Sequence, residues 1–451
     1  MKEEIIHYLR GRIFPLSTLP FPKHIVEQLI NEGLIQTKKG VSVQRRLFRR
    51  FYRCERCHNT DQRRFTTYDC TSCQKSCTYC RNCLALGRVS TCTTLCTIPN
   101  TEQLVLRQVP KWEGTYSPSQ RLAAEQMTAR AKNHPQLLYA VCGAGKTEVL
   151  FAPIRAALQR GEYVALVSPR TDVIRELLPR VQKVFKNIDI LVLYEGKKPQ
   201  PLKAPLVLAT THQLYRYERA FDAVYVDEAD AFPYNADETL QRAVQKAVKP
   251  NGHIHFITAT ATREMITHYE RVGDVLTIPV RYHGYPLPEP TYRASFFYRE
   301  RLRKGMLPRN VKQWLQQVVQ RGKPYLLFFA SIDEMHRALP LVRTIDATVR
   351  AVHASSESRE EDVLALRHGE VRGLLTTTIL ERGVTIPDVQ VAVLGAERRI
   401  FTKEALIQIG GRVGRSKDAP TGDFILFHHG ITFAMDAAKK EIQRLNQEAF
   451  R

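Results

Sequence analysis

The segment Gly143-Ala144-Gly145-Lys146-Thr147 is the most informative in the chain, because it stands between an apolar run, Leu137–Cys142, and a helix-compatible run, Glu148–Leu158. Glycines allow the backbone to wrap around a phosphate, so that its N–H groups and the start of the next helix point at the anion. Lys146 is expected to reach the β- and γ-phosphates of ATP, and the Thr147 hydroxyl is expected to bind Mg²⁺. The segment therefore predicts a strand, a phosphate-binding loop and a helix.

A second apolar run ends in two carboxylates, in the order Val224-Tyr225-Val226-Asp227-Glu228. Asp227 is placed to hold Mg²⁺ through water, and Glu228 to orient and polarise the water that attacks the γ-phosphate. The alternative is a solvated acidic loop, which the apolar strand before it disfavours. Upstream of the phosphate loop, Gln120 stands where ATPases of this kind place a glutamine that reads the adenine ring.

Near the end of the chain, the segment Gln408-Ile409-Gly410-Gly411-Arg412-Val413-Gly414-Arg415 holds two arginines three residues apart. This is about one helical turn, so both side chains can face the same way. From a second domain they could neutralise the charge that builds on the γ-phosphate during transfer. Most arginine pairs at this spacing are solvated, but the surrounding glycines favour a functional pair. The catalytic residues expected are therefore Lys146, Asp227, Glu228, Arg412 and Arg415.

From residue 104 onward, short apolar runs alternate with helical patterns in two series, separated by the Pro- and Tyr-rich passage Pro279–Pro290. This alternation is typical of a doubly wound parallel sheet with both faces covered. We expect an α/β chain with two tandem RecA-like domains, over 104–285 (ATP-binding) and 286–451. A segment over 1–50 and a cysteine-rich, zinc-binding module over 51–103 come before them. We also expect the sheets of the two RecA-like domains, here called the motor sheets, to bury their own cores without the cysteine-rich module.

Nine of the ten cysteines lie between Cys54 and Cys96, most of them in Cys-x-x-Cys pairs. In a reducing cytosol such a cluster is more typical of a metal site than of disulfides. Thiolates at this spacing bind Zn²⁺ tetrahedrally, and two pairs complete one structural site. An iron–sulfur cluster is the competing interpretation. The metal ligands expected are Cys54, Cys57, Cys70, Cys73, Cys80 and Cys83.

Two groupings of these thiols are open. The first joins Cys54/Cys57 with Cys80/Cys83, joins Cys70/Cys73 with Cys92/Cys96, and leaves Cys77 over. The second is a simpler zinc ribbon of Cys54/Cys57 with Cys70/Cys73.

The 451-residue chain carries 67 Lys plus Arg against 45 Asp plus Glu, a formal net charge of +22. A basic balance of this size favours a polyphosphate partner, and nucleic acid is the partner expected. No apolar run approaches the roughly 18 residues that span a bilayer, and the first residues do not resemble a signal peptide. We therefore expect the chain to work in the cytoplasm.

In their order and spacing, these motifs resemble superfamily 2 helicases and translocases, of which the DEAD-box proteins are one branch. The resemblance covers about residues 112–430. It implies that Ser168-Pro169-Arg170 and Thr210-Thr211 contact a single strand, and that Thr258-Ala259-Thr260 couples hydrolysis to domain movement. Thr376-Thr377-Thr378 with Glu381-Arg382-Gly383 would contact nucleotide and strand. The residues expected to bind the nucleotide are then Gln120, Gly143, Ala144, Gly145, Lys146, Thr147, Glu381 and Gly383.

The run Cys77-Thr78-Tyr79-Cys80-Arg81-Asn82-Cys83-Leu84-Ala85-Leu86-Gly87-Arg88-Val89, together with the ATP-site motifs, resembles the ComFA family, the competence ATPases of Gram-positive bacteria. This resemblance implies a DNA-stimulated ATPase that drives single-stranded DNA into the cytoplasm during natural transformation. It also implies a peripheral position at the inner face of the membrane, near the uptake channel, and a ComFC-type partner.

Two alternatives remain. The replication-restart helicase PriA also joins zinc to this motor, but its zinc module lies between the motor halves, whereas every clustered cysteine here precedes Lys146. A zinc-dependent DNA-binding scaffold with a degenerate ATP site is disfavoured by the intact Lys146, Asp227, Glu228, Arg412 and Arg415.

Overall fold

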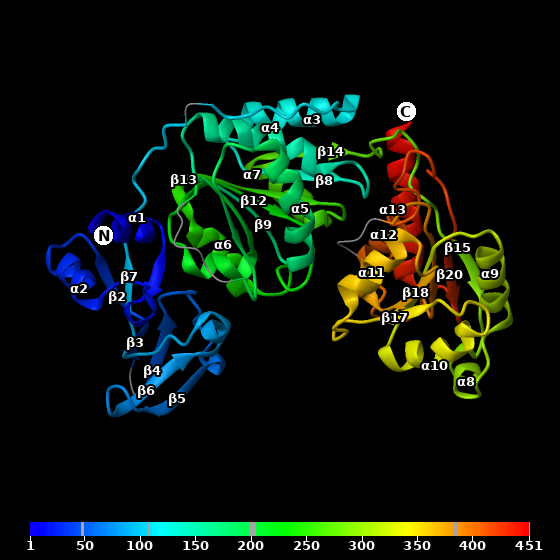
Figure 1. Cartoon of the computed structure of the whole chain (residues 1–451), viewed down its shortest axis with the longest axis horizontal. Helices are drawn as coiled ribbons and strands as arrows, with labels where there is room; N and C mark the ends of the chain where they lie inside the picture. The colour runs from blue at the N-terminus through cyan, green and yellow to red at the C-terminus, as the bar shows by residue number, and fades with distance from the viewer. Residues whose placement is uncertain (47–48, 107, 198–203, 382–385, 451) are drawn as a thin grey trace. The chain divides into compact units, whose positions relative to one another are not determined.

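The computed structural model describes residues 1–46, 49–106, 108–197, 204–381 and 386–450 (Figure 1). It contains two compact units. The first comprises Met1–Thr115, Leu122–Leu138 and Thr147–Leu276, and the second comprises Tyr116–Arg121, Tyr139–Lys146 and Thr277–Arg451.

A seven-stranded sheet in the order β10-β11-β9-β12-β13-β8-β14 belongs to the first unit, apart from the ends of β8 and β14. Its strands are β8 (Gln136–Ala140), β9 (Val164–Ser168), β10 (Ile190–Leu193), β11 (Leu206–Thr210), β12 (Phe221–Asp227), β13 (Val248–Thr258) and β14 (Asp274–Ile278). The helices between them are α3 (Pro118–Arg130), α4 (Lys146–Gln159), α5 (Thr171–Val184), α6 (Glu238–Ala247) and α7 (Arg263–Val272). Strand β9 pairs in parallel with β11 and β12.

Every residue of β8, β9 and β11 is buried. Because successive side chains of a strand point to opposite faces, both faces of this sheet must be covered. The short apolar runs in the sequence follow from this double burial, because neither face needs polar residues.

The N-terminal region forms a three-stranded antiparallel sheet, β1-β7-β2, and two hairpins, β3-β4 and β5-β6. Its elements are α1 (Lys2–Leu9), β1 (Ile13–Pro15), α2 (Lys23–Asn31), β2 (Gln36–Lys39), β3 (Val41–Arg46), β4 (Arg49–Cys54), β5 (Phe65–Cys70), β6 (Lys75–Cys80) and β7 (Thr94–Thr97). Strand β7 pairs with both β1 and β2, so the first forty residues and the end of the cysteine-rich region share one sheet.

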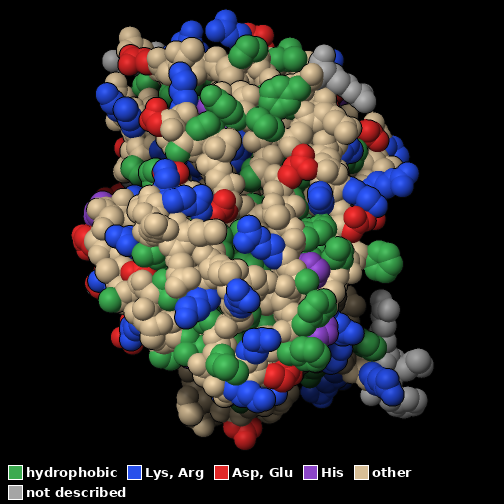
Figure 2. Space-filling view, turned by 90° about the vertical axis from the view of Figure 1, so that its right-hand side faces the viewer, with side chains coloured by type: hydrophobic (Ala, Val, Ile, Leu, Met, Phe, Trp, Pro, Cys, Tyr) green, Lys and Arg blue, Asp and Glu red, His purple; other side chains and the backbone are tan. Residues whose placement is uncertain are grey.

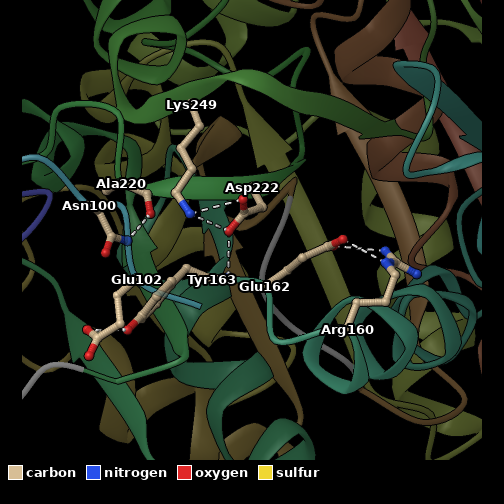
Figure 3. A network of polar contacts seen from close by, with 8 residues as sticks. All are labelled: Asn100, Glu102, Arg160, Glu162, Tyr163, Ala220, Asp222 and Lys249. Carbon is tan, nitrogen blue, oxygen red and sulfur yellow. Dashed lines mark hydrogen bonds and ion pairs between the residues drawn. The ribbon is translucent and has the colours of Figure 1, made fainter. Parts of the chain in front are cut away.

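Polar contacts tie the chain after β7 to the parallel sheet (Figure 3). The Asn100 side-chain amide donates to the Ala220 carbonyl at 2.8 Å, and the Tyr163 hydroxyl donates to Glu102 at 3.4 Å. Asp222 accepts from the Tyr163 N–H at 2.9 Å and pairs with Lys249 at 2.9 Å. The contacts of Asn100 and Glu102 attach the N-terminal region to the end of the sheet at which β9 and β12 begin, and those of Asp222 hold that end together.

The second unit holds a six-stranded sheet in the order β15-β20-β19-β16-β18-β17, and all its pairings are parallel. The strands are β15 (Thr291–Ala294), β16 (Tyr325–Phe329), β17 (Arg350–Val352), β18 (Gly373–Thr376), β19 (Gln390–Leu394) and β20 (Phe424–His428). The helices are α8 (Tyr298–Arg303), α9 (Arg309–Gln320), α10 (Ile332–Arg343), α11 (Arg359–His368), α12 (Lys403–Gly410) and α13 (Phe433–Ala449). Its core centres on Trp314 of α9, which packs among buried residues of β16, β19 and β20.

Within the described ranges, no helix combines the length and the apolar character that crossing a membrane requires.

Candidate ATP site and cysteine clusters

The phosphate loop leaves β8 and enters α4 at Lys146. Gly143 and Gly145 have φ angles of 82° and 74°, in the left-handed region that favours glycine. The Ala144 N–H donates to the Val141 carbonyl at 3.1 Å and closes a tight turn. The loop therefore has the strand, turn and helix order that the sequence predicts.

Gln120 lies against this loop. Its side chain is only 4% exposed. The Nε2 amide donates to the Ala144 carbonyl at 2.9 Å and to the Gly145 carbonyl at 3.4 Å, while Oε1 accepts from the Ser117 N–H at 2.8 Å. Gln120 thus binds two backbone carbonyls of the phosphate loop and stabilises the loop conformation without a nucleotide.

The two carboxylates of the acidic motif stand at the end of β12. Asp227 is buried, and its Oδ1 accepts from the Glu228 N–H at 2.9 Å. Glu228 has a φ of 55°, an unusual conformation for a residue with a side chain, of the kind that concentrates at functional sites. Ligands of such sheets bind beyond the carboxyl ends of the strands, which is where Asp227 and Glu228 lie.

Asp230 joins the acidic motif to the segment Thr258-Ala259-Thr260. Its carboxylate accepts from Thr258 Oγ1 at 2.5 Å and from Thr260 Oγ1. The Thr260 N–H also donates to Thr258 Oγ1 at 3.0 Å, and both threonines are buried. The acidic motif and the segment Thr258-Ala259-Thr260 are therefore directly joined by hydrogen bonds.

Arg412 and Arg415 follow α12 in the second unit. Arg412 is buried, and its Nε donates to the Glu381 carbonyl at 3.0 Å; the Arg415 Nε donates to the Gly411 carbonyl at 2.9 Å. Glu381, expected at the nucleotide, thus contacts Arg412 through its backbone. Gly383, also expected there, lies outside the described residues, as does Arg382.

Arg281 supports the arginine segment, and sequence reasoning missed it. It is 1% exposed, and its guanidinium donates to the carbonyls of Gly414 at 2.8 Å, Pro420 at 3.2 Å and Val413. Burial lowers its pKa to about 10, with smaller effects from neighbouring charges. Its place in the Pro- and Tyr-rich passage was the one signal in the sequence, because the carbonyls that it binds lie more than 130 positions further along the chain.

Most of the hydroxyls expected at a nucleic-acid strand are buried, whereas Thr377 and Thr378 are half-buried. Ser168, Thr210, Thr211 and Thr376 are buried, and Thr376 Oγ1 donates to the Val352 carbonyl at 2.9 Å. A nucleic-acid strand at these positions would contact backbone groups and flanking side chains before it reached the buried hydroxyls.

Four cysteines come together between the ends of β4 and β6: Cys54, Cys57, Cys80 and Cys83. All four are buried, with sulfur–sulfur distances of 3.5 Å for Cys54–Cys83 and 3.6 Å for Cys57–Cys80. Four thiolates at about 2.3 Å from one Zn²⁺ stand about 3.8 Å apart in a tetrahedron. The cluster therefore has the dimensions of a zinc tetrathiolate, and its members are those of the first grouping expected from the sequence.

A second cluster joins Cys70, Cys73, Cys77 and Cys92. Its sulfurs are 3.8 Å apart for Cys70–Cys92 and 3.3 Å for Cys73–Cys77, and Cys92 is exposed. The Cys73 N–H donates to Cys70 and, as the largest of several effects, lowers the pKa of that thiol to about 6. A thiol of this kind is largely thiolate near neutral pH, the form that binds metal.

The expected grouping of the second cluster was wrong in one ligand. It assigned Cys96 and left Cys77 over, whereas the structure uses Cys77 and excludes Cys96. The simpler ribbon of Cys54/Cys57 with Cys70/Cys73 is also excluded. Cys96 lies on β7 and packs in an apolar cluster with Tyr8 and Leu9, where burial raises its pKa to about 11.

Two buried cations border the first cluster. The Arg56 guanidinium donates to the carbonyls of Cys83 at 2.7 Å and Gly87 at 2.6 Å. Lys246 of α6 is 9% exposed; its ammonium donates to the Arg56 carbonyl and, at 3.3 Å, to the Tyr215 carbonyl. A zinc tetrathiolate carries a charge of about −2. Arg56 and Lys246 supply the two opposite charges that a buried site of this kind requires.

The expectation that the motor sheets bury their cores without the cysteine-rich module was wrong. Cys54, Cys57, Cys80 and Cys83 belong to one buried cluster with Tyr215, Leu240 and Val244 of the ATP-binding sheet and its covering elements. The module thus completes the core on one face of the sheet.

Three family models match the chain. Competence protein ComFA N-terminal domain covers residues 1–97, DEAD/DEAH box helicase covers 117–267, and Helicase conserved C-terminal domain covers 310–417. Competence protein ComFA of Bacillus subtilis is 40% identical over 451 residues, 99% of this chain and 96% of that protein. ComFA of Streptococcus pneumoniae is 41% identical over 378 residues, 82% of this chain and 86% of that protein.

Solved structures share the fold at low identity. Mycobacterium smegmatis helicase Lhr, bound to single-stranded DNA and AMP-PNP, superposes with a TM-score of 0.54 at 18% identity, over 74% of this chain and 50% of that chain. Saccharomyces cerevisiae Dbp5, bound to RNA and ADP BeF3, gives 0.53 at 17% identity, over 73% and 91%.

The two parallel sheets and the helicase matches define an ATP-dependent, helicase-type enzyme of superfamily 2, and its DEAD domain implies the use of ATP and Mg²⁺. At 40% identity over almost its whole length to a competence protein, the chain belongs to the ComFA family.

Proposed function

We propose that this protein is a single-stranded-DNA translocase that uses ATP to pull transforming DNA into the cytoplasm. The observation that carries the proposal is the identity to ComFA proteins over the motor and the N-terminal region together. A match confined to the helicase domains would fit any motor of this class, whereas the N-terminal match is specific to competence proteins.

In the proposed cycle, Lys146 and Thr147 hold the phosphates and Mg²⁺, and Asp227 holds the metal ion from the end of β12. Glu228 orients the attacking water, and Arg412 and Arg415 neutralise charge on the γ-phosphate as it is transferred. Gln120 adds adenine contact to its support of the loop. The hydrogen bonds that the Thr258 and Thr260 hydroxyls donate to Asp230 support a role for that segment in coupling the state of the nucleotide to domain movement.

Charge supports single-stranded DNA as the polymer. The net charge is +22. On the face shown in Figure 2, Lys and Arg side chains are spread widely, with Asp and Glu side chains scattered among them. Such a surface attracts a phosphate backbone, and release of its counterions makes the binding weaken steeply with salt.

Zinc is the metal we propose for both cysteine clusters. The tetrahedral sulfur spacing of the first and its two neutralising cations support a closed structural site. The second has the same set of four thiols but is more exposed, which supports a second ion that exchanges more readily. The ions would shape the module and, through the shared core, support the ATP-binding sheet.

The proposal includes a peripheral position at the inner membrane face, next to the uptake channel, with a ComFC-type partner. These features come with the family resemblance, and binding assays with the purified partner would test them.

The experiment that tests the proposal compares cells carrying wild-type protein or Lys146→Ala. Transformation frequency should fall severely in the variant, while growth and recovery from stalled replication stay normal. If Lys146→Ala cells transform normally but fail to restart replication, a PriA-like function is correct and the uptake function is wrong.

A further inference from the structure

Three neighbouring parallel strands of the second unit, β15, β20 and β19, have their carboxyl ends at the same side of its sheet. The segments that leave this edge carry Phe296 and Phe297 after β15, His429 after β20, and Arg398 and Arg399 after β19. Because parallel strands have their carboxyl ends on the same side, these side chains emerge together.

Two phenyl rings are exposed at this edge. Phe296 is 57% and Phe297 63% exposed, and both rings meet the His429 imidazole edge-on, at centroid distances of 5.6 and 5.5 Å. The Phe297 N–H donates to His429 Nδ1 at 3.4 Å. Phe296, Phe297 and His429, here called the aromatic edge, thus form a mutually supported surface whose phenyl faces are open to a ligand.

The backbone holds these rings outward. Phe297 has a φ of 54°, a conformation rare for a bulky side chain. The next residue, Tyr298, is buried and begins α8, and Leu302 of the same helix packs in the core. With α8 fixed in the core, the left-handed residue turns the chain so that neither phenyl ring folds inward. Strained backbone and exposed aromatic rings together are typical of a binding site.

Positive charge surrounds the aromatic edge. Residues 296–304 and 397–403 hold seven Lys and Arg but only two Glu. Glu397 accepts from the His429 N–H at 3.2 Å, and Arg299 is paired with Glu334 of α10 at 3.0 Å.

We propose that the aromatic edge is a stacking site for the bases of single-stranded nucleic acid, with Arg398 and Arg399 contacting the adjoining phosphates. The inference rests on the proposed DNA-dependent function and adds the residues that grip the bases. Aromatic rings accept any base by stacking, and nearby cations follow the backbone, which suits a motor that must bind every sequence.

The test pairs two protein variants with two oligonucleotides. Wild type, Phe296→Ala/Phe297→Ala and Phe450→Ala are titrated against a fluorescent 20-mer of thymidine and against an abasic 20-mer that keeps the phosphates. Phe450 is the matched control, because it is also 57% exposed but lies at the other end of α13, about 25 Å from the edge. Thermal midpoints verify that each variant is folded.

The phenyl pair should matter only when bases are present. We expect the double variant to bind the thymidine 20-mer roughly tenfold or more weakly, the loss typical of one base stack. It should bind the abasic 20-mer as wild type does, with an unchanged salt dependence. Arg398→Ala/Arg399→Ala should weaken both oligonucleotides and reduce the salt slope by about 1.4, since each phosphate contact on a single strand contributes about 0.7.

An equal loss on both oligonucleotides would mean that the rings do not read bases, and no loss on either would remove the edge from the DNA path. Unchanged DNA binding with lost self-association in sedimentation would make the edge a contact between copies of this chain. Each of these results overturns the inference and leaves the motor function standing. Failure of the wild-type protein to bind the thymidine 20-mer would overturn the proposed function itself.

Discussion

Asp230 and Thr258 are joined by a hydrogen bond of 2.5 Å, from the threonine hydroxyl to the carboxylate, and Asp230 also accepts from Thr260. These contacts link the acidic motif after β12 to the end of β13, two neighbouring strands of the ATP-binding sheet.

Asp230→Ala should therefore act on coupling more than on nucleotide binding. We expect the DNA-stimulated rate to fall while ATP affinity changes little, because the nucleotide loop is not part of this contact. Thr258→Ala should cost much less in the Asp230→Ala background than in wild type, since groups in direct contact are not additive. Steady-state kinetics of the four proteins measure this, and additive losses would show that the two residues act independently.

Arg281 should control the rate through the arginine segment that it supports. Arg281→Met removes the donors to Val413 and Gly414, and a displacement of about 1 Å at a reacting group can cost about 100-fold. We expect kcat to fall at least tenfold with a small change in ATP affinity. Arg293→Met, at an exposed position of β15, is the control. Equal effects of the two substitutions on kcat would contradict the role of Arg281.

The first cysteine cluster should depend on Lys246, an ammonium from the motor. Purified protein should hold two zinc ions, of which one leaves quickly when a chelator is added. Lys246→Met should speed the release of the slow ion and lower the unfolding temperature, because a buried tetrathiolate then lacks one of its two cations. The exposed Lys75→Met is the control, and release kinetics identical to wild type in Lys246→Met would contradict the charge argument.

His255 should make the ATP-binding sheet sensitive to acid. Its imidazole is fully buried beside the Tyr225 ring, at 4.8 Å, and burial lowers its pKa to about 3. The unfolded chain binds a proton near pH 6.5 and the folded chain does not. Folding stability should therefore fall by about 1.4 kcal/mol per pH unit below 6.5, or about 2 kcal/mol at pH 5.

His255→Phe should lose this pH dependence while keeping a ring in place. The difference in unfolding free energy between wild type and variant, measured in urea at pH 7 and pH 5, should shift by about 2 kcal/mol in favour of the variant. A constant difference would show that His255 is protonated in the folded protein.

Much of the motor was predictable, because its strands are contiguous apolar runs that end in chemically distinctive residues such as Gly143 and Asp227. The edge strands β10, β14 and β15 were not predicted: β14 and β15 mix apolar with polar residues, and β10, although wholly apolar, has only four residues. Cys-x-x-Cys spacing indicated a metal site, but it could not decide whether Cys77 or Cys96 joins Cys70, Cys73 and Cys92 in the second cluster. That choice depends on which part of the chain folds back next to Cys70 and Cys73. Lys246 and Arg281 act on carbonyls far along the chain, and no local pattern reports such contacts.

Hydrolysis at the ATP site should drive movement along single-stranded DNA. The most direct measurement is the ATPase rate of the zinc-loaded protein at low salt, without DNA, with single-stranded DNA and with duplex. We predict a severalfold increase with single-stranded DNA, a smaller one with duplex, and at least ~100-fold slower hydrolysis by Glu228→Gln at retained ATP binding. Equal rates with and without DNA would contradict a DNA-driven motor, and a Glu228→Gln protein that hydrolyses ATP as wild type does would contradict the role of Glu228.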